Sequence, residues 1–77
     1  MAKRDGWRVT ADHRDFFRLE RDDDMIVCYK HRNGSVAIDK MGDVHLTPAR
    51  AIQFAAKVRE IAARAANKAA KGGGDGR

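Results

Sequence analysis

The sequence has few of the residues that constrain a small protein: one cysteine and one proline among 77 residues. With a single thiol, Cys28, no internal disulfide can form, which favours a reducing, cytoplasmic setting. No apolar run approaches the ~18 residues that a membrane-spanning helix needs, and the charged N-terminal segment has no apolar centre of a signal peptide. We therefore expect no membrane partner and no signal peptide. A core this small also favours support from a second copy or another protein.

Patterns for catalysis or ligand binding are missing as well. There is no paired acid and base, no nucleophile motif and no cofactor fingerprint, and the glycines at 72–74 follow a helical segment instead of preceding one. Cys28 and His31 have the spacing C-x-x-H, but a strand would point them to opposite faces, and a zinc site needs about four converging ligands. The acidic run 22–24 reads as a solvated turn. We expect a non-enzymatic protein without a metal, a cofactor or a small-molecule substrate.

Charge is distributed unevenly along the chain. Residues 1–46 carry nine basic and nine acidic side chains, whereas residues 47–77 carry seven basic and two acidic ones, so the whole net charge of +5 belongs to the second part. Such asymmetry is typical of proteins that contact a polyanion, although it also fits a solvated helix face.

The first part has the pattern of an antiparallel sheet. Short segments rich in β-branched and aromatic residues alternate with polar turns, and they predict strands at residues 7–11, 16–21, 25–31, 35–40 and 44–46. Asn33-Gly34 predicts a two-residue type I′ hairpin turn, because both turn positions need a positive φ. Three-residue turns are expected at 22–24 and 41–43.

These turn lengths predict which side chains share a face of the sheet. The apolar face towards the helix would comprise Phe17, Leu19, Val27, Tyr29, Val36, Ile38, Val44 and Leu46. The other face would be mixed and half charged, as in an antiparallel sheet with one side in water: Phe16, Arg18, Glu20, Ile26, Cys28, Lys30, Ala37 and Asp39.

A long helix follows. Thr47 is a good N-cap and Pro48 suits the first helical position, and no glycine or proline interrupts the segment before Gly72. Helical spacing predicts an apolar stripe against the sheet, formed by Ala51, Phe54, Ala55, Val58, Ile61, Ala62 and Ala65. We predict an α+β fold: a four- or five-stranded antiparallel meander packed on one face by a long C-terminal helix.

The expected organisation is a flexible arm at 1–5, a single domain at 6–71 and a disordered tail at 72–77. A helix reaching residue 70 would be ~35 Å long, whereas the strands would span only ~17–20 Å. The last turns of the helix should therefore extend beyond the sheet, where a partner or a polyanion could order them.

The order of strands and helix resembles the single-stranded-DNA-binding transcriptional coactivator family over about residues 16–61, including the strand-to-helix junction at Leu46-Thr47. The phage-integrase arm-binding domain is a looser analogy. In the coactivator family a curved sheet faces DNA and the helix builds a dimer. The sheet of that family is strongly basic, whereas the predicted sheet here is neutral.

Two hypotheses for function follow. The first is a small nucleic-acid-binding accessory or regulatory protein whose basic helix tracks phosphates, using Arg50, Lys57, Arg64, Lys68 and Lys71, with Arg18, Lys30 and Arg32 of the sheet beside Phe16 as a stacking platform. The second is a protein-interaction or dimerisation module with no nucleic-acid role. Its interface would be the alanine-rich helix face formed by Ile52, Ala56, Ala63, Ala66 and Ala70.

Overall fold

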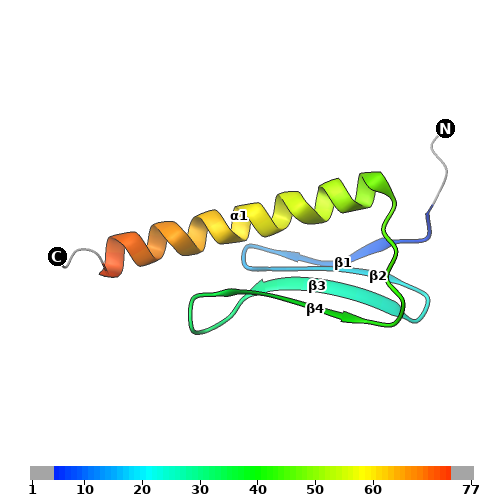
Figure 1. Ribbon diagram of the computed structural model, residues 1–77, viewed down its shortest axis with the longest axis horizontal. Helices are drawn as coiled ribbons and strands as arrows, with labels where there is room; N and C mark the ends of the chain where they lie inside the picture. The colour runs from blue at the N-terminus through cyan, green and yellow to red at the C-terminus, as the bar shows by residue number, and fades with distance from the viewer. Residues whose placement is uncertain (1–4, 74–77) are drawn as a thin grey trace.

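Four strands and one helix make up the described part of the chain (Figure 1). The computed structural model describes residues 5–73, with side chains described up to residue 67. The elements are β1 (Arg8–His13), β2 (Phe16–Arg21), β3 (Asp24–Lys30), β4 (Val36–Met41) and α1 (Pro48–Gly73). The sheet is antiparallel with the order β1-β2-β3-β4, and α1 covers one of its faces. The predicted α+β fold is confirmed, but residues 44–46 form no strand and belong to the segment that joins β4 to α1.

The turn between β2 and β3 is one residue shorter than predicted. Arg21 pairs with Asp24, which leaves only Asp22 and Asp23 in the turn. Asp22 has a φ of 51°, a left-handed conformation that aspartate tolerates better than most residues. The prediction of a three-residue turn at 22–24 is therefore wrong, because Asp24 belongs to β3.

The turn between β3 and β4 also differs from its prediction. His31 N donates to Ser35 O, and Gly34 N donates to His31 O, so three residues form the turn between the pair 31 and 35. Gly34 has a φ of 93°, whereas Asn33 has no positive φ and instead accepts hydrogen bonds from Ser35 N and Oγ at its side chain. A turn closed by one left-handed glycine replaces the predicted two-residue type I′ turn.

Together the two turns shift the register of β3 with its neighbouring strands by one residue relative to the prediction. Phe17 pairs with Cys28 and Cys28 with Ile38, while Tyr29 pairs with Phe16 and Ala37. A slip of one residue moves every side chain of a strand to the other face. Ile26 and Cys28 therefore face α1, and Val27 and Tyr29 face the open side of the sheet, which reverses the predicted arrangement of β3.

The core lies between the sheet and α1. It is formed by buried apolar side chains of β2, β3, α1 and the segment before β1, namely Trp7, Phe17, Leu19, Cys28, Phe54 and Ile61. The Phe17 and Phe54 ring centroids are 6.2 Å apart, within the range of favourable aromatic pairs. Phe17, Leu19, Ile61 and Cys28 are its largest fully buried side chains, and burial of their apolar surface stabilises the fold.

The start of α1 is fixed by a capping contact that the sequence predicts. Thr47 Oγ1 accepts a hydrogen bond from Arg50 N (3.2 Å) and donates one to Asp5 Oδ2 (2.8 Å). The first contact satisfies a free N–H group of the first helical turn. The second joins the helix start to residue 5, the last residue of the segment predicted to be a flexible arm.

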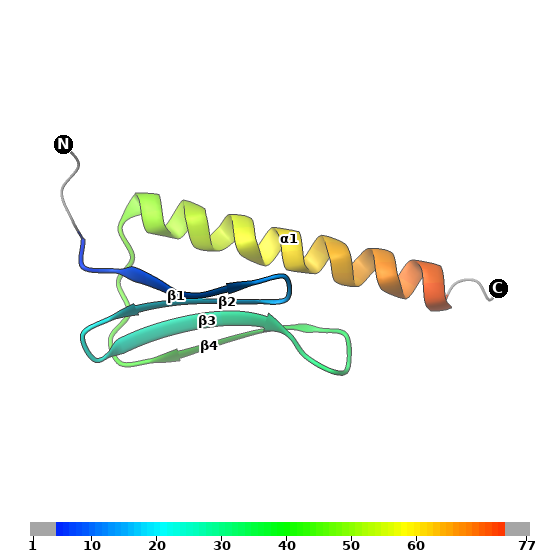
Figure 2. The ribbon, with the colours of Figure 1, turned by 180° about the vertical axis from the view of Figure 1, so that it is seen from behind.

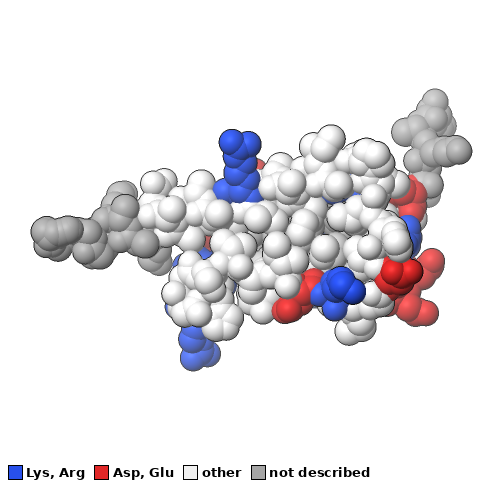
Figure 3. Space-filling view, viewed as in Figure 1, with Lys and Arg blue, Asp and Glu red and all other residues white. Residues whose placement is uncertain are grey.

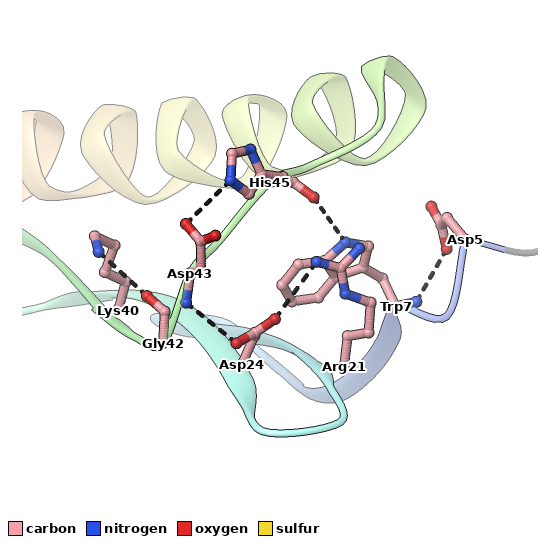
Figure 4. A network of polar contacts seen from close by, with 8 residues as sticks. All are labelled: Asp5, Trp7, Arg21, Asp24, Lys40, Gly42, Asp43 and His45. Atoms are coloured by element: carbon pink, nitrogen blue, oxygen red, sulfur yellow. Dashed lines mark hydrogen bonds and ion pairs between the residues drawn. The ribbon is translucent and has the colours of Figure 1, made fainter.

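A polar network joins the same end of the sheet to the segment before α1 (Figure 4). Trp7 Nε1 donates to His45 O at 3.2 Å, and the Arg21 guanidinium lies 4.5 Å from the Trp7 ring centroid. Asp24 accepts hydrogen bonds from Arg21 (3.4 Å) and from the backbone N–H of Asp43 (3.2 Å). These contacts hold the β4–α1 segment against the β2–β3 turn.

At its other end α1 extends past the sheet. Figures 1 and 2 show the helix continuing beyond the β1–β2 turn, and Gly73 is its last residue. Within the described side chains, the contacts between α1 and the sheet reach as far as Arg64, which donates a hydrogen bond to the carbonyl of Arg14. The overhang agrees with the length argument from the sequence.

Candidate nucleic-acid interface

Arg50 is the first of the heptad-spaced basic residues of α1, and it turns towards the sheet. Its guanidinium donates to the Trp7 carbonyl at 2.7 Å, lies 3.3 Å from Asp5 Oδ2 and also bonds Gln53. The side chain is 26% exposed. Arg50 thus holds the N-terminal segment against the helix.

Lys57, one heptad later, is more deeply enclosed. Its ammonium lies 2.9 Å from Asp12 Oδ1 and 3.5 Å from Glu60 Oε1, and the side chain is 18% exposed. The hydrogen bond to Asp12, opposed by desolvation, raises the pKa of Lys57. The ammonium also lies 5.5 Å from the Phe17 ring centroid, so it is bound to its own sheet from two directions.

Arg64 completes the series at the β1–β2 turn. Its guanidinium lies 3.8 Å from Asp15 Oδ1 and 3.8 Å from Glu60 Oε1, and it donates to the Arg14 carbonyl. Each of the three basic residues thus faces an acidic residue from the N-terminal part of the chain: Arg50 faces Asp5, Lys57 faces Asp12 and Arg64 faces Asp15. The basic residues that were predicted to bind phosphate instead stabilise the contact between the helix and the rest of the fold. The side chains of Lys68 and Lys71, the other two, lie outside the described residues.

This pairing also shifts the buried face of the helix from its predicted position. Phe54 and Ile61 are buried as expected, but Ala51 and Ala55, on the flank away from the basic stripe, are exposed. The ion pairs with β1 and with the β1–β2 turn draw the basic flank of the helix towards the sheet. The alanine flank therefore faces away from the sheet.

The three basic residues predicted for the sheet do not gather on one face. Arg18 lies on the open face, 2.9 Å from Glu20 and hydrogen-bonded to Thr10. Lys30 shares the side of Cys28, which faces α1, and Arg32 is exposed in the β3–β4 turn. Only Arg18 lies next to Phe16, with its guanidinium 5.8 Å from the ring centroid.

The open face instead carries a row of four rings, which we call the ring row: His13, Phe16, Tyr29 and His31. Neighbouring ring centroids are 6.4 Å (His13–Phe16), 6.0 Å (Phe16–Tyr29) and 6.5 Å (Tyr29–His31) apart, and the central pair is stacked. The row runs across the sheet because its members come from β1, β2, β3 and the turn that follows β3. No helix of the described chain covers this face (Figure 2).

The Tyr29 hydroxyl donates to Asp39 Oδ2 at 3.1 Å. This hydrogen bond, together with the negative charge of Asp39, raises the pKa of Tyr29, so the hydroxyl stays protonated near neutral pH. The contact fixes the direction of the ring within the row. Asp39 keeps its negative charge beside the row, where it opposes an anionic ligand.

The two ends of the sheet differ in their share of acidic residues, although Asp15 lies at the ring-row end and Arg8, Arg21 and Lys40 lie at the other. Exposed Arg14 and Arg32 follow His13 and His31 in the two turns at the ring-row end. The other end holds the acidic residues of the β2–β3 turn, of the residues after β4 and of the segment before β1: Asp5, Asp22, Asp23, Asp24 and Asp43. Figure 3 shows acidic side chains near the end where α1 begins, and basic side chains spread more widely over this side of the molecule.

The helix face predicted as a partner interface is exposed. Ile52 is 71% exposed, and Ala56, Ala63 and Ala66 are exposed on the same face. Ala70 belongs to this face by spacing, but its side chain lies outside the described residues. The predicted interface is therefore accessible as far as residue 67.

The cysteine and histidine considered for metal binding are far from forming one site. Cys28 is fully buried in the core, and burial raises the pKa of its thiol, whereas His31 is exposed in the ring row. Within residues 5–73, no group of three or more His, Cys, Asp or Glu side chains is arranged to hold a metal ion.

Comparison with known proteins adds no functional information. No protein-family model, curated protein or solved structure gives a significant match to this chain. Over the described part of the chain, no helix combines the length and apolar character needed to cross a membrane. The case for a function therefore depends on the site geometry.

Three ring-row members were not singled out from the sequence, which identified only Phe16 for stacking. Tyr29 was assigned to the helix side because the β2–β3 turn was predicted one residue too long. The sequence pattern assigns no stacking role to His13 or His31. The signal was present in the spacing, because a two-residue turn at 22–23 places Tyr29 directly opposite Phe16.

Proposed function

We propose that this protein is a non-enzymatic accessory or regulatory protein that binds single-stranded nucleic acid on the open face of its sheet. The observation that carries the proposal is the ring row, four neighbouring rings on an uncovered face with centroids 6.0–6.5 Å apart. Bases stack on such side chains with little regard to sequence, each contributing ~1–3 kcal/mol.

The charges around the row support an anionic ligand. Arg14 and Arg32 are exposed in the turns that follow two of its rings. Arg18 lies 5.8 Å from the Phe16 ring centroid, but its charge is paired with Glu20. The described acidic side chains lie mainly at the opposite end, so an approaching phosphate chain meets less repulsion at the ring row than there. The single, buried Cys28 fits a cytoplasmic location, which we include in the proposal.

The proposal moves the nucleic-acid site from the helix to the sheet. Arg50, Lys57 and Arg64 would have to leave Asp5, Asp12 and Asp15 to contact phosphates, and each exchange would weaken the fold. A triple change of basic helix residues to glutamate would therefore mix unfolding with loss of binding. Variants in the ring row and its turns give a cleaner test.

The test is fluorescence anisotropy with a labelled oligothymidine at ~50 mM salt, repeated at higher salt. We expect binding that weakens as salt rises. Tyr29→Ala should weaken binding roughly 5- to 100-fold through lost stacking, and Arg14→Glu should weaken binding and flatten the salt dependence.

Arg59→Glu is the matched control for Arg14→Glu, because it makes the same charge change at an exposed helix position away from the ring row. Its affinity should stay close to that of the unchanged protein. Absence of binding at ~50 mM salt, or equal losses for Arg14→Glu and Arg59→Glu, would refute a site on the sheet. Circular dichroism of each variant verifies that it is folded.

A protein-interaction role is the second candidate. It is favoured by Ile52, an isoleucine that is 71% exposed on a helix face otherwise lined by alanines. Large apolar side chains exposed in this way are common at protein interfaces. This role requires that Ile52→Lys abolish binding to a partner while leaving oligothymidine binding unchanged.

A further inference from the structure

β4 is an edge strand whose free side is regular and uncovered. It spans Val36–Met41, it has β3 as its one strand neighbour in the described chain, and its register with β3 is continuous. The other edge strand, β1, is interrupted by a bulge between Val9 and Ala11. Bulges protect an edge against pairing with another strand, and β4 has neither a bulge nor a proline.

The hydrogen bonds of the β3–β4 turn show which backbone groups face outward. The residues 31 and 35 form a hydrogen-bonded pair, through His31 N and Ser35 O. Because such pairs alternate along an antiparallel ladder, residues 37, 39 and 41 direct their N–H and C=O groups to β3. Val36, Ile38 and Lys40 therefore direct theirs to the open edge.

The side chain at the middle of this edge is apolar. Val36 packs against the core, whereas Ile38, two residues further along, is 54% exposed although its neighbour Cys28 is fully buried. Free backbone groups beside an exposed isoleucine give the edge both hydrogen-bonding and apolar surface. This combination is suited to accepting another strand.

We propose that β4 pairs with β4 of a second copy of this chain, antiparallel and centred on Ile38. In this register Ile38 lies opposite Ile38, Val36 opposite Lys40, and Ala37 opposite Asp39. The pairing places no like charges opposite each other, and it uses the outward backbone groups of Val36, Ile38 and Lys40 on both strands.

The charge distribution favours this antiparallel arrangement of two identical chains. Arg32 and Asp43 flank β4 at its two ends, and both are exposed; the Asp43 side chain is 89% exposed. A two-fold axis through Ile38 brings Arg32 of each copy beside Asp43 of the other. The same contact between Arg32 and Asp43 therefore forms at both ends of the paired strands. Such repetition is expected of a closed dimer with two-fold symmetry.

The test measures mass in solution without nucleic acid, so that its result is separate from the proposed nucleic-acid binding. Light scattering coupled to gel filtration at ~100 µM should give twice the chain mass of 8.6 kDa. Ile38→Lys should raise the dissociation constant at least tenfold. Ile52→Lys, the same change at a more exposed isoleucine on α1, should leave the dimer intact.

A charge exchange tests the register. Arg32→Asp and Asp43→Arg should each weaken the dimer severalfold, and the double variant should recover most of the loss. A monomer at all concentrations overturns the proposal, as does a dimer that is lost with Ile52→Lys but not with Ile38→Lys. Failure of the double variant to recover overturns the Ile38-centred register. Urea unfolding of each variant establishes that its monomer is folded.

Discussion

Lys57 Nζ lies 2.9 Å from Asp12 Oδ1 and 5.5 Å from the Phe17 ring centroid, so one side chain ties α1 to both β1 and β2. Lys57 looked like a surface charge in the sequence because it recurs with Arg50 and Arg64 every seven residues. In the fold its side chain is only 18% exposed, and its charge serves the contact between helix and sheet.

Reversal of the Lys57 charge should destabilise the fold. Lys57→Glu would place a carboxylate beside Asp12 and Glu60 and remove the cation from Phe17, and we expect a loss of about 1–2 kcal/mol in the free energy of unfolding. Urea denaturation measures it. Arg59→Glu, which alters the same charge at an exposed position, should change stability by less than ~0.5 kcal/mol; equal losses would contradict this role of Lys57.

Alanine substitutions at Gly42 and Gly34 should distinguish the cost of a steric clash from the cost of backbone strain. Both have positive φ, at 85° and 93°, but an added Cβ at Gly42 would collide with the Asp24 carboxylate, whereas one at Gly34 meets nothing within 4 Å. Gly34→Ala should therefore cost ~1 kcal/mol from its backbone conformation alone. Gly42→Ala should cost more, because it also displaces Asp24 from its hydrogen bond with Asp43 N. Thermal unfolding of the two variants gives the comparison, and a smaller loss at Gly42 would contradict it.

Asp5 should make stability depend on acid pH. The hydrogen bond from Thr47, aided by Trp7 N–H and by Arg50 and opposed by desolvation, lowers the pKa of Asp5 in the folded protein. A lowered pKa contributes stability that is fully present above the ordinary aspartate pKa of about 4 and is lost as pH falls through the folded value. Asp5→Asn should therefore be less stable than the unchanged protein at pH 7. The difference should shrink as pH falls below the ordinary aspartate pKa, and a difference that does not change with pH would contradict the assignment.

Cys28 should report on unfolding. Its thiol is fully buried and burial raises its pKa, so the reactive thiolate is scarce and inaccessible in the folded protein. We expect a disulfide reagent to react at least ~100-fold more slowly with the folded protein than with the protein in denaturant, in keeping with the stability of a small domain. Absorbance of the released thiol measures both rates. Fast labelling without denaturant would place Cys28 outside the core.

The fold was predictable from the sequence because its signals are local. Alternating apolar residues indicate the four strands, and Thr47-Pro48 marks the helix start that the structure confirms. Turn length was not predictable in the same way. At 22–24 three consecutive aspartates give no signal for which of them is the first residue of β3, and one residue decides which face carries Tyr29.

The role of the basic helix residues could not be predicted for another reason. Heptad spacing shows that Arg50, Lys57 and Arg64 share a flank of α1, but not what that flank meets. Their partners Asp5, Asp12 and Asp15 are 45 or more positions away in the chain, and only the tertiary structure brings them together. The net charge follows from the sequence, but the tertiary structure decides which charged side chains are free to contact a ligand.

The contacts between the helix and the N-terminal part of the sheet also bear on the order of folding. Thr47 with Asp5, Arg50 with Trp7 and Arg64 with Arg14 join positions 42, 43 and 50 residues apart, whereas each hairpin of the sheet closes a short turn. Closing a long loop costs more chain entropy than closing a hairpin. We therefore expect the hairpins to form first, and substitutions in the helix contacts to accelerate unfolding more than they slow folding.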